Sequence, residues 1–74
     1  MINIMTQTFY KRHTGEKHEV AVNFGWINPA SHGHYEVLVD GQLYTTAERK
    51  AAAFDEIVDI IKTNNWTPVR GQFD

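Results

Sequence analysis

The most regular pattern along the chain is a strict alternation of residue types over residues 18–26. One side of an extended chain would carry His18, Val20, Val22, Phe24 and Trp26. The residues between them are small or polar. A period of two is typical of a β-strand with one buried face. We therefore predict a strand here, with its aromatic and β-branched face packed on the core.

The neighbouring segments predict a small antiparallel sheet around this strand. Residues 6–13 contain β-forming side chains with little apolar alternation, which is typical of an edge strand. A third strand is expected over residues 34–39. The dipeptide Asp40-Gly41 predicts a two-residue type I′ hairpin, because both central residues of that turn adopt positive φ. The turn would set Leu38 opposite Leu43 and Val37 opposite Tyr44 in a short fourth strand.

A helical period replaces the strand period near Thr45. The run Thr45-Thr46-Ala47-Glu48 fits a capping box, in which threonine and glutamate side chains bond free amides of the first turn. Apolar residues then recur every three or four positions, which predicts one core-facing stripe. The stripe comprises Ala47, Ala51, Phe54, Val58 and Ile61, widened by Ile57 and Ile60. Asn64-Asn65 is the expected carboxyl-terminal cap, and Pro68 argues against a longer helix.

Strands first and a helix last predict an α+β domain. We expect a single domain, residues 1–74, with a small antiparallel sheet of three to four strands packed against one C-terminal amphipathic helix (ββββα or βββα). A chain of 74 residues builds one small core, which is commonly reinforced by disulfides, a metal or a partner subunit. Disulfides are excluded because the chain has no cysteine.

Composition narrows the function classes further. Nine acidic and seven basic residues give a formal net charge of −2, whereas a nucleic-acid-binding domain of this size is usually basic. The first residues lack the pattern of a signal peptide, and no apolar run reaches the ~20 residues of a membrane helix. With the lack of cysteine, this predicts a soluble cytoplasmic protein without membrane contact. Met1 and Met5 are both open as the native start.

The sequence offers no pattern for catalysis or a cofactor. Its only serine, Ser31, lies beside His32 in a predicted loop, and no glycine-rich phosphate loop is present, so we expect no catalytic residue and no cofactor. Four histidines lie close together in sequence: His13, His18, His32 and His34. Imidazole suits zinc or nickel, but the spacing matches no metal-site motif. We predict no metal site and leave metal binding by these histidines open; the alternative is exposed loop and strand-end positions.

Acidic side chains of the predicted helix form the first candidate binding surface. Asp55 and Asp59 are four residues apart, and Glu56 follows Asp55. Like charges at this spacing slightly weaken an isolated helix, so their presence favours a positively charged protein partner. Trp26, at the end of its strand, is the expected apolar anchor. The alternative is a helix surface that is simply solvated.

Basic side chains beside the first strand form the second candidate surface. Lys11, Arg12 and Lys17 flank a predicted turn and are suited to contact the phosphates of a nucleic acid. Glu16 and Glu19 oppose that use, and a charged edge strand also blocks aggregation between sheets without any ligand. A third possibility is a homodimer whose sheet edges pair, which would supplement the small core.

The run YEVLVDGQLY (residues 35–44), followed by an alanine-rich helix over residues 46–61, resembles two known groups. One is the sheet-plus-helix DNA-binding domain of integrase arms and plant ethylene-response factors. The other is the carboxyl-terminal half of double-stranded RNA-binding domains. The chain lacks the basic sheet face of the first group, and only Arg49-Lys50 stands where the second has a lysine cluster. No functional residue is therefore transferred from either.

Our main hypothesis is a small, acidic, non-enzymatic protein-binding domain. In size and charge the chain is similar to phage and mobile-element inhibitors, including anti-CRISPR proteins, which implies docking on a larger target and blocking of a functional site. The residues expected to make that contact are Asp55, Glu56, Asp59 and Trp26. The alternative hypothesis is a nucleic-acid-binding module that uses the sheet edge through Lys11, Arg12 and Lys17.

Overall fold

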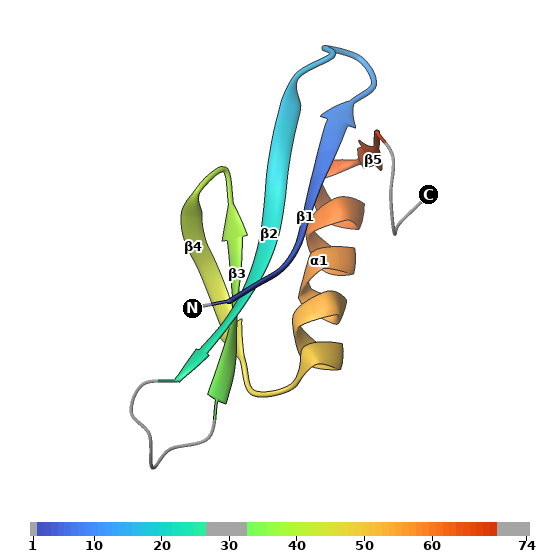
Figure 1. Cartoon of the computed structure of the whole chain (residues 1–74). Helices are drawn as coiled ribbons and strands as arrows, with labels where there is room; N and C mark the ends of the chain where they lie inside the picture. Colours follow the sequence, from blue (N-terminus) through green and yellow to red (C-terminus); the bar gives the residue numbers. More distant parts are fainter. Residues whose placement is uncertain (1, 27–32, 70–74) are drawn as a thin grey trace.

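A computed structural model describes residues 2–26 and 33–69 and contains one antiparallel sheet and one helix (Figure 1). The elements are β1 (Ile2–Lys11), β2 (Lys17–Trp26), β3 (Gly33–Val39), β4 (Gln42–Ala47), α1 (Lys50–Asn64) and β5 (Trp66–Pro68). The α+β class is confirmed. The sheet has five strands rather than three or four, and α1 is not the last element because β5 follows it.

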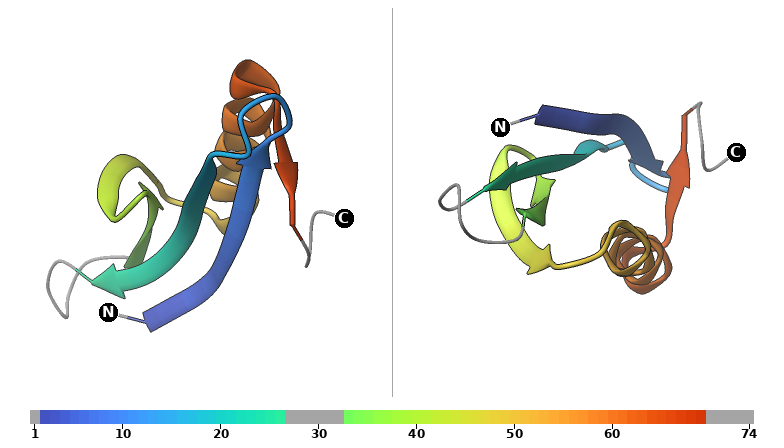
Figure 2. Two further views of the ribbon diagram at one scale, coloured as in Figure 1. Left: turned by 90° about the horizontal axis from the view of Figure 1, so that it is seen from above. Right: turned by 60° about the horizontal axis from the view of Figure 1, so that its bottom comes forward.

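The strand order across the sheet is β4-β3-β2-β1-β5, and every neighbouring pair is antiparallel. Four strands therefore form a simple meander, and α1 carries the chain from the β4 edge to the opposite edge, where β5 pairs with β1. The sheet curls, and α1 lies across its concave side (Figure 2). At 15 residues, this one helix of the described ranges is too short to cross a membrane.

The core lies between the concave side of the sheet and α1. Its buried apolar residues are Met5, Phe9, Val20, Val22, Val37, Ala53, Ile57 and Ile60. The alternation predicted for β2 is confirmed in its central part, because Val20 and Val22 are fully buried whereas Glu19, Ala21 and Asn23 are not. Towards the end of the strand Gly25, on the other face, is buried as well. Val22 pairs with the buried residues Met5 and Val37, so this face of β2 is part of the core.

The predicted helix start was wrong, whereas the predicted stripe is confirmed at Ile57 and Ile60, which are buried, and at Phe54 and Ile61, which pack against the core. Thr45 to Ala47 pair with β3, so α1 begins only at Lys50, after Arg49, which caps the helix without a side-chain hydrogen bond. The residues that α1 buries are Ala53, Ile57 and Ile60, whereas Ala51 is exposed. Pairing with β3 overrides the local capping preference. The carboxyl-terminal cap is confirmed: Asn65 adopts the left-handed conformation with φ 56° and donates its N–H to Ile61 O.

The Asp40-Gly41 turn is confirmed as a tight hairpin. Both residues have positive φ, 52° and 82°, as a type I′ turn requires. Leu38 faces Leu43 as predicted, but Val37 faces Thr45 instead of Tyr44. The reason is a β-bulge in which Tyr44 is the extra residue, and one extra residue shifts every later pairing by one position.

The first strand is longer and more central than the sequence predicts. β1 begins at Ile2, and β5 covers its last residues by pairing Phe9 with Pro68 and Lys11 with Trp66. An edge position was predicted because the alternation in residues 6–13 includes a polar residue, Gln7, which is nevertheless buried. β5 itself was not predicted, since three residues that include a proline are a weak strand pattern.

Candidate functional site

β4 forms one edge of the sheet and is the most exposed strand of the fold. Its six residues, QLYTTA, include no charge and no proline, and four of them are exposed. Leu43 is 59% exposed and Tyr44 57%. Among the residues that the structure describes, no strand pairs with the outer side of β4. The backbone amides and carbonyls on that side are therefore available to another extended chain.

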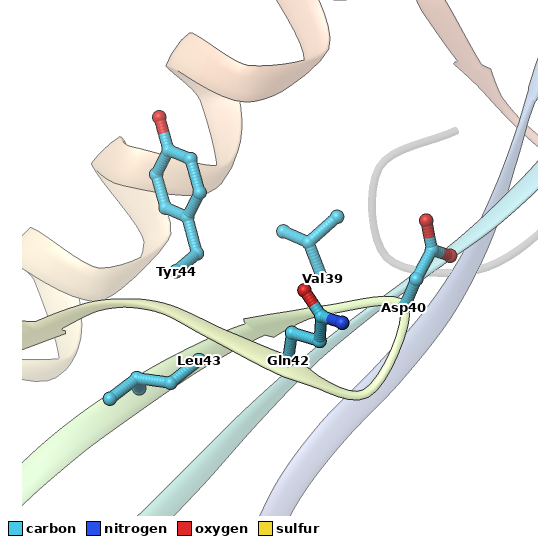
Figure 3. Close-up of a pocket in the computed structure, with 5 residues that line it drawn as sticks. All are labelled: Val39, Asp40, Gln42, Leu43 and Tyr44. Atoms are coloured by element: carbon cyan, nitrogen blue, oxygen red, sulfur yellow. The ribbon is translucent and has the colours of Figure 1, made fainter.

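A shallow depression accompanies this edge at the end nearest the hairpin turn. It has a volume of about 430 Å³ and is lined by Val39, Asp40, Gln42, Leu43 and Tyr44 (Figure 3). Figure 3 shows the Tyr44 side chain directed to the helix side of the sheet and the Leu43 side chain directed to the other side. An added strand would thus meet an exposed apolar side chain on each of its faces, because successive residues of a strand point to opposite sides.

The other strands at the periphery carry features that interfere with pairing. β5 has only three residues and includes Pro68, which has no amide to donate. The part of β1 that β5 does not cover is interrupted by a bulge at Ile4. There the side-chain amide of Asn3 donates from Nδ2 to Met5 O at 3.3 Å. Bulges, prolines and short strands are the usual protections of sheet edges. β4 also carries a bulge, at Tyr44, but it has six residues and no proline, and four of its residues are exposed, Leu43 and Tyr44 among them.

A hydrogen-bonded cluster holds the hairpin turn that precedes β4. The His18 ring lies between two carboxylates, with Nδ1 2.7 Å from Asp40 Oδ2 and Nε2 3.1 Å from Glu16 Oε1. It also stacks on Trp66, with ring centroids 4.4 Å apart. Asp40 Oδ1 accepts a further hydrogen bond from the Glu19 N–H at 2.9 Å. The cluster thereby joins both hairpin turns to β2 and β5 and fixes where β4 begins.

The same contacts shift the ionisation of Asp40. The hydrogen bond to His18, followed by the one from the Glu19 N–H, holds the pKa of the Asp40 carboxyl below its ordinary value of 3.8. Hydrogen bonds to a carboxylate favour its charged form. Asp40 is thus a fixed negative charge at the start of β4 at neutral pH.

The acidic residues predicted from the sequence lie on α1, which packs on the sheet. Asp55 and Asp59 are exposed, and Glu56 is half-buried. The Trp26 backbone ends β2, but the side chain lies outside the described part of the chain, so its place beside the acids stays a prediction.

The predicted basic residues lie together at the β1–β2 hairpin, which projects beyond the rest of the sheet (Figure 1). Lys11, Arg12 and Lys17 are all exposed there. Glu16 and Glu19 are exposed on the same hairpin, so acidic charge accompanies the cations.

The histidines do not assemble a metal site within the described ranges, where no group of three or more suitable side chains comes together. His13 is exposed in the hairpin turn, and His18 is engaged by its two carboxylates. His34 Nε2 lies 3.4 Å from Glu36 Oε2. His32 lies outside the described residues.

Comparison with protein-family models, curated proteins and solved structures gives no match. The β4 edge was not predicted from the sequence, although Leu43 and Tyr44 belong to a predicted short strand that contains no charged side chain. That composition is unusual for an edge and would have marked it once the strand order was known.

Proposed function

We propose that the protein is a non-enzymatic protein-binding domain that adds an extended segment of a partner to the outer side of β4. The observation that carries this proposal is a six-residue edge strand without charge or proline, on which the side chains of Leu43 and Tyr44 are exposed. In binding by strand addition, main-chain hydrogen bonds supply affinity and alternate side chains supply selectivity. The depression beside Tyr44 gives one face of the added strand a place for an apolar side chain.

The chemistry of the edge favours a protein over a nucleic acid. Phosphate binding requires cations, and Gln42–Ala47 contains none. Exposed aromatic and aliphatic side chains beside unpaired backbone suit a polypeptide. The acidic residues of α1, Asp55, Glu56 and Asp59, would then act as a second contact that steers a basic partner. A domain that docks in this way inhibits its target when it covers a surface that the target needs.

A second candidate function rests on the β1–β2 hairpin. Its exposed Lys11, Arg12 and Lys17 project from the sheet and favour contact with nucleic acid phosphates. This mode predicts binding that weakens steeply as salt is raised, because counterion release dominates such affinity.

The two functions are separated by capture experiments with edge variants. The wild-type protein is immobilised and exposed to lysate of the organism that encodes it, with and without nuclease, and bound proteins are identified by mass spectrometry. A variant with Leu43→Lys places a charge on the β4 edge. A matched control with Ile2→Lys changes an apolar residue of similar exposure, 55% against 59%, on β1.

We expect a stoichiometric protein that survives nuclease and is lost with Leu43→Lys but retained with Ile2→Lys. Charge removal at Asp55, Glu56 and Asp59 should slow association without abolishing it. Retention that disappears with nuclease, and with neutral replacements of Lys11, Arg12 and Lys17, would replace this proposal with the nucleic-acid function. Capture that is indifferent to Leu43→Lys would remove β4 from the binding surface.

A further inference from the structure

We propose that the strand received by β4 is β4 of a second copy of this chain, so that two domains form one continuous antiparallel sheet about a twofold axis. This inference rests on the proposed function, because it names the partner of the same edge. It follows from the charge distribution along β4, from the protections of the other edges and from the size of the core.

The absence of charge in β4 is what makes self-pairing feasible. In a twofold interface each residue meets the same segment of the other copy, so a charged residue near the axis meets its own like charge. Like charges directly opposite one another destabilise a strand pair. Gln42–Ala47 brings only amide, hydroxyl and apolar side chains to the axis. A strand that receives an unrelated partner has no need for this neutrality along its whole length.

The two ends of β4 carry opposite charge. Asp40 precedes the strand, whereas residues 48–50, Glu-Arg-Lys, follow it with a net charge of +1. Antiparallel pairing of two copies brings the acidic start of one strand near the basic end of the other. The Asp40 carboxylate is held toward His18, so this attraction acts over a distance and favours the antiparallel arrangement without a new ion pair.

β4 contributes little to the core, against which only its last residue, Ala47, packs. The described core has eight buried apolar residues, and none of them comes from β4. A second copy would cover Leu43 and Tyr44 and extend the sheet, which is a common route to stability for a domain of this length. Pairing between copies would thus complete the part of the fold that α1 leaves open.

The protections of the other edges explain why such association stops at two copies. A twofold interface uses the same surface on both chains and leaves no further β4 edge free. At the far side of the sheet β5 has only three residues and includes Pro68, which interferes with additional pairing there. Growth into a fibre, which needs two open edges on each copy, is therefore opposed by the described strands.

The test is the oligomeric state of the purified full chain, measured by sedimentation equilibrium over a concentration series up to the millimolar range. Leu43→Lys puts a like charge on both copies at the proposed interface, and Ile2→Lys is the matched control. Circular dichroism of each variant checks that the fold is retained. Hydrogen exchange at low and high protein concentration locates the contact through the amides that gain protection.

We expect a monomer–dimer equilibrium with protection gained in Gln42–Ala47, a dissociation constant raised about tenfold or more by Leu43→Lys, and no comparable change with Ile2→Lys. A chain that stays monomeric throughout the series overturns the inference, as does a dimer whose protected amides lie outside β4. A monomer that still captures a protein from lysate through Leu43 overturns only this inference. A monomer whose capture ignores Leu43 overturns the proposed function as well.

Discussion

Asp40 Oδ2 lies 2.7 Å from His18 Nδ1, and this contact ties the turn between β3 and β4 to the neighbouring strand β2. Asp40 sits in the turn with positive φ, so the residue that closes the hairpin also fastens it to the sheet. The Asp40 N–H donates to Glu19 O at 2.8 Å and strengthens the same junction. The start of β4, and with it the proposed binding edge, therefore depends on a contact outside its own hairpin.

The pKa of Asp40 gives this contact a pH dependence. Because the folded pKa is below the ordinary value of 3.8, the stabilisation is complete above that value and is lost as pH falls through the folded pKa. We expect the free energy of unfolding to fall below pH ~4, and to fall less in a variant with Asp40→Asn. Asparagine retains the turn conformation and the bond from Glu19. The difference at neutral pH should be under about 1 kcal/mol, since the side chain is half-exposed. Chemical unfolding over a pH series measures both chains; equal acid slopes would contradict the assignment.

Ala51 and Ala53 test which side of α1 faces the sheet, because the apolar periodicity predicted that Ala51 faces the core. Ala53 is fully buried, whereas Ala51 is exposed. Ala53→Leu should destabilise the domain by about 1–3 kcal/mol, because the core has no room for the added methyl groups. Ala51→Leu should change the unfolding free energy by less than about 0.5 kcal/mol. Urea unfolding compares the two variants; a larger cost at Ala51 would show that the helix presents its other side to the sheet.

Gly33, at the start of β3, packs against the ring of Phe24. A Cβ added at Gly33 would collide with the ring's far end, so Gly33→Ala should cost about 1–3 kcal/mol by forcing the ring to move. The cost should shrink in a Phe24→Leu background, with a coupling of at least about 0.5 kcal/mol. A double-mutant cycle in urea measures this coupling. If the destabilisations by Gly33→Ala and Phe24→Leu simply add, the alanine does not collide with the Phe24 ring.

Trp66 joins β5 to the rest of the fold through two ring contacts. Its ring stacks on His18, and its centroid lies 6.3 Å from that of Phe9. Trp66→Leu should lower the unfolding free energy by about 1–2 kcal/mol, because stacking is lost while an apolar side chain remains. Val69→Ala, which shortens a partly exposed side chain just after β5, should cost less than about 0.5 kcal/mol. Similar costs for the two variants would mean that Trp66 does not anchor β5.

The parts of the fold that local chemistry determines were predictable from the sequence. The alternation of β2, the Asp40-Gly41 turn and the Asn65 cap each follow from neighbours in the chain, and the structure confirms all three. The bulge at Tyr44 and the late start of α1 were not predictable, because pairing with β3 determines both. Where pairing with a distant strand is stronger than the local helix preference of a segment, the segment adopts the strand.

The candidate site likewise combines features that local sequence predicts with features that only strand pairing determines. Helical spacing predicted the acidic residues of α1, of which Asp55 and Asp59 are exposed. That β4 is an edge follows from the strand order, and the strand order depends on whether β5 pairs with β1 or with β4. Three residues, Trp66–Pro68, decide this, and their composition favours a turn as much as a strand.

The pairing of Phe9 with Pro68 joins segments from the two halves of the chain and has a consequence for synthesis. During translation, the β1–β2 hairpin emerges long before the residues of β5 do. Until β5 arrives, the nascent sheet has an uncovered margin at β1 as well as at β4, and closing so long a loop is entropically slow. Residues 66–68 are therefore the last strand of this sheet to pair, and a chain stalled before Trp66 would expose unpaired backbone of both β1 and β4 to neighbouring chains.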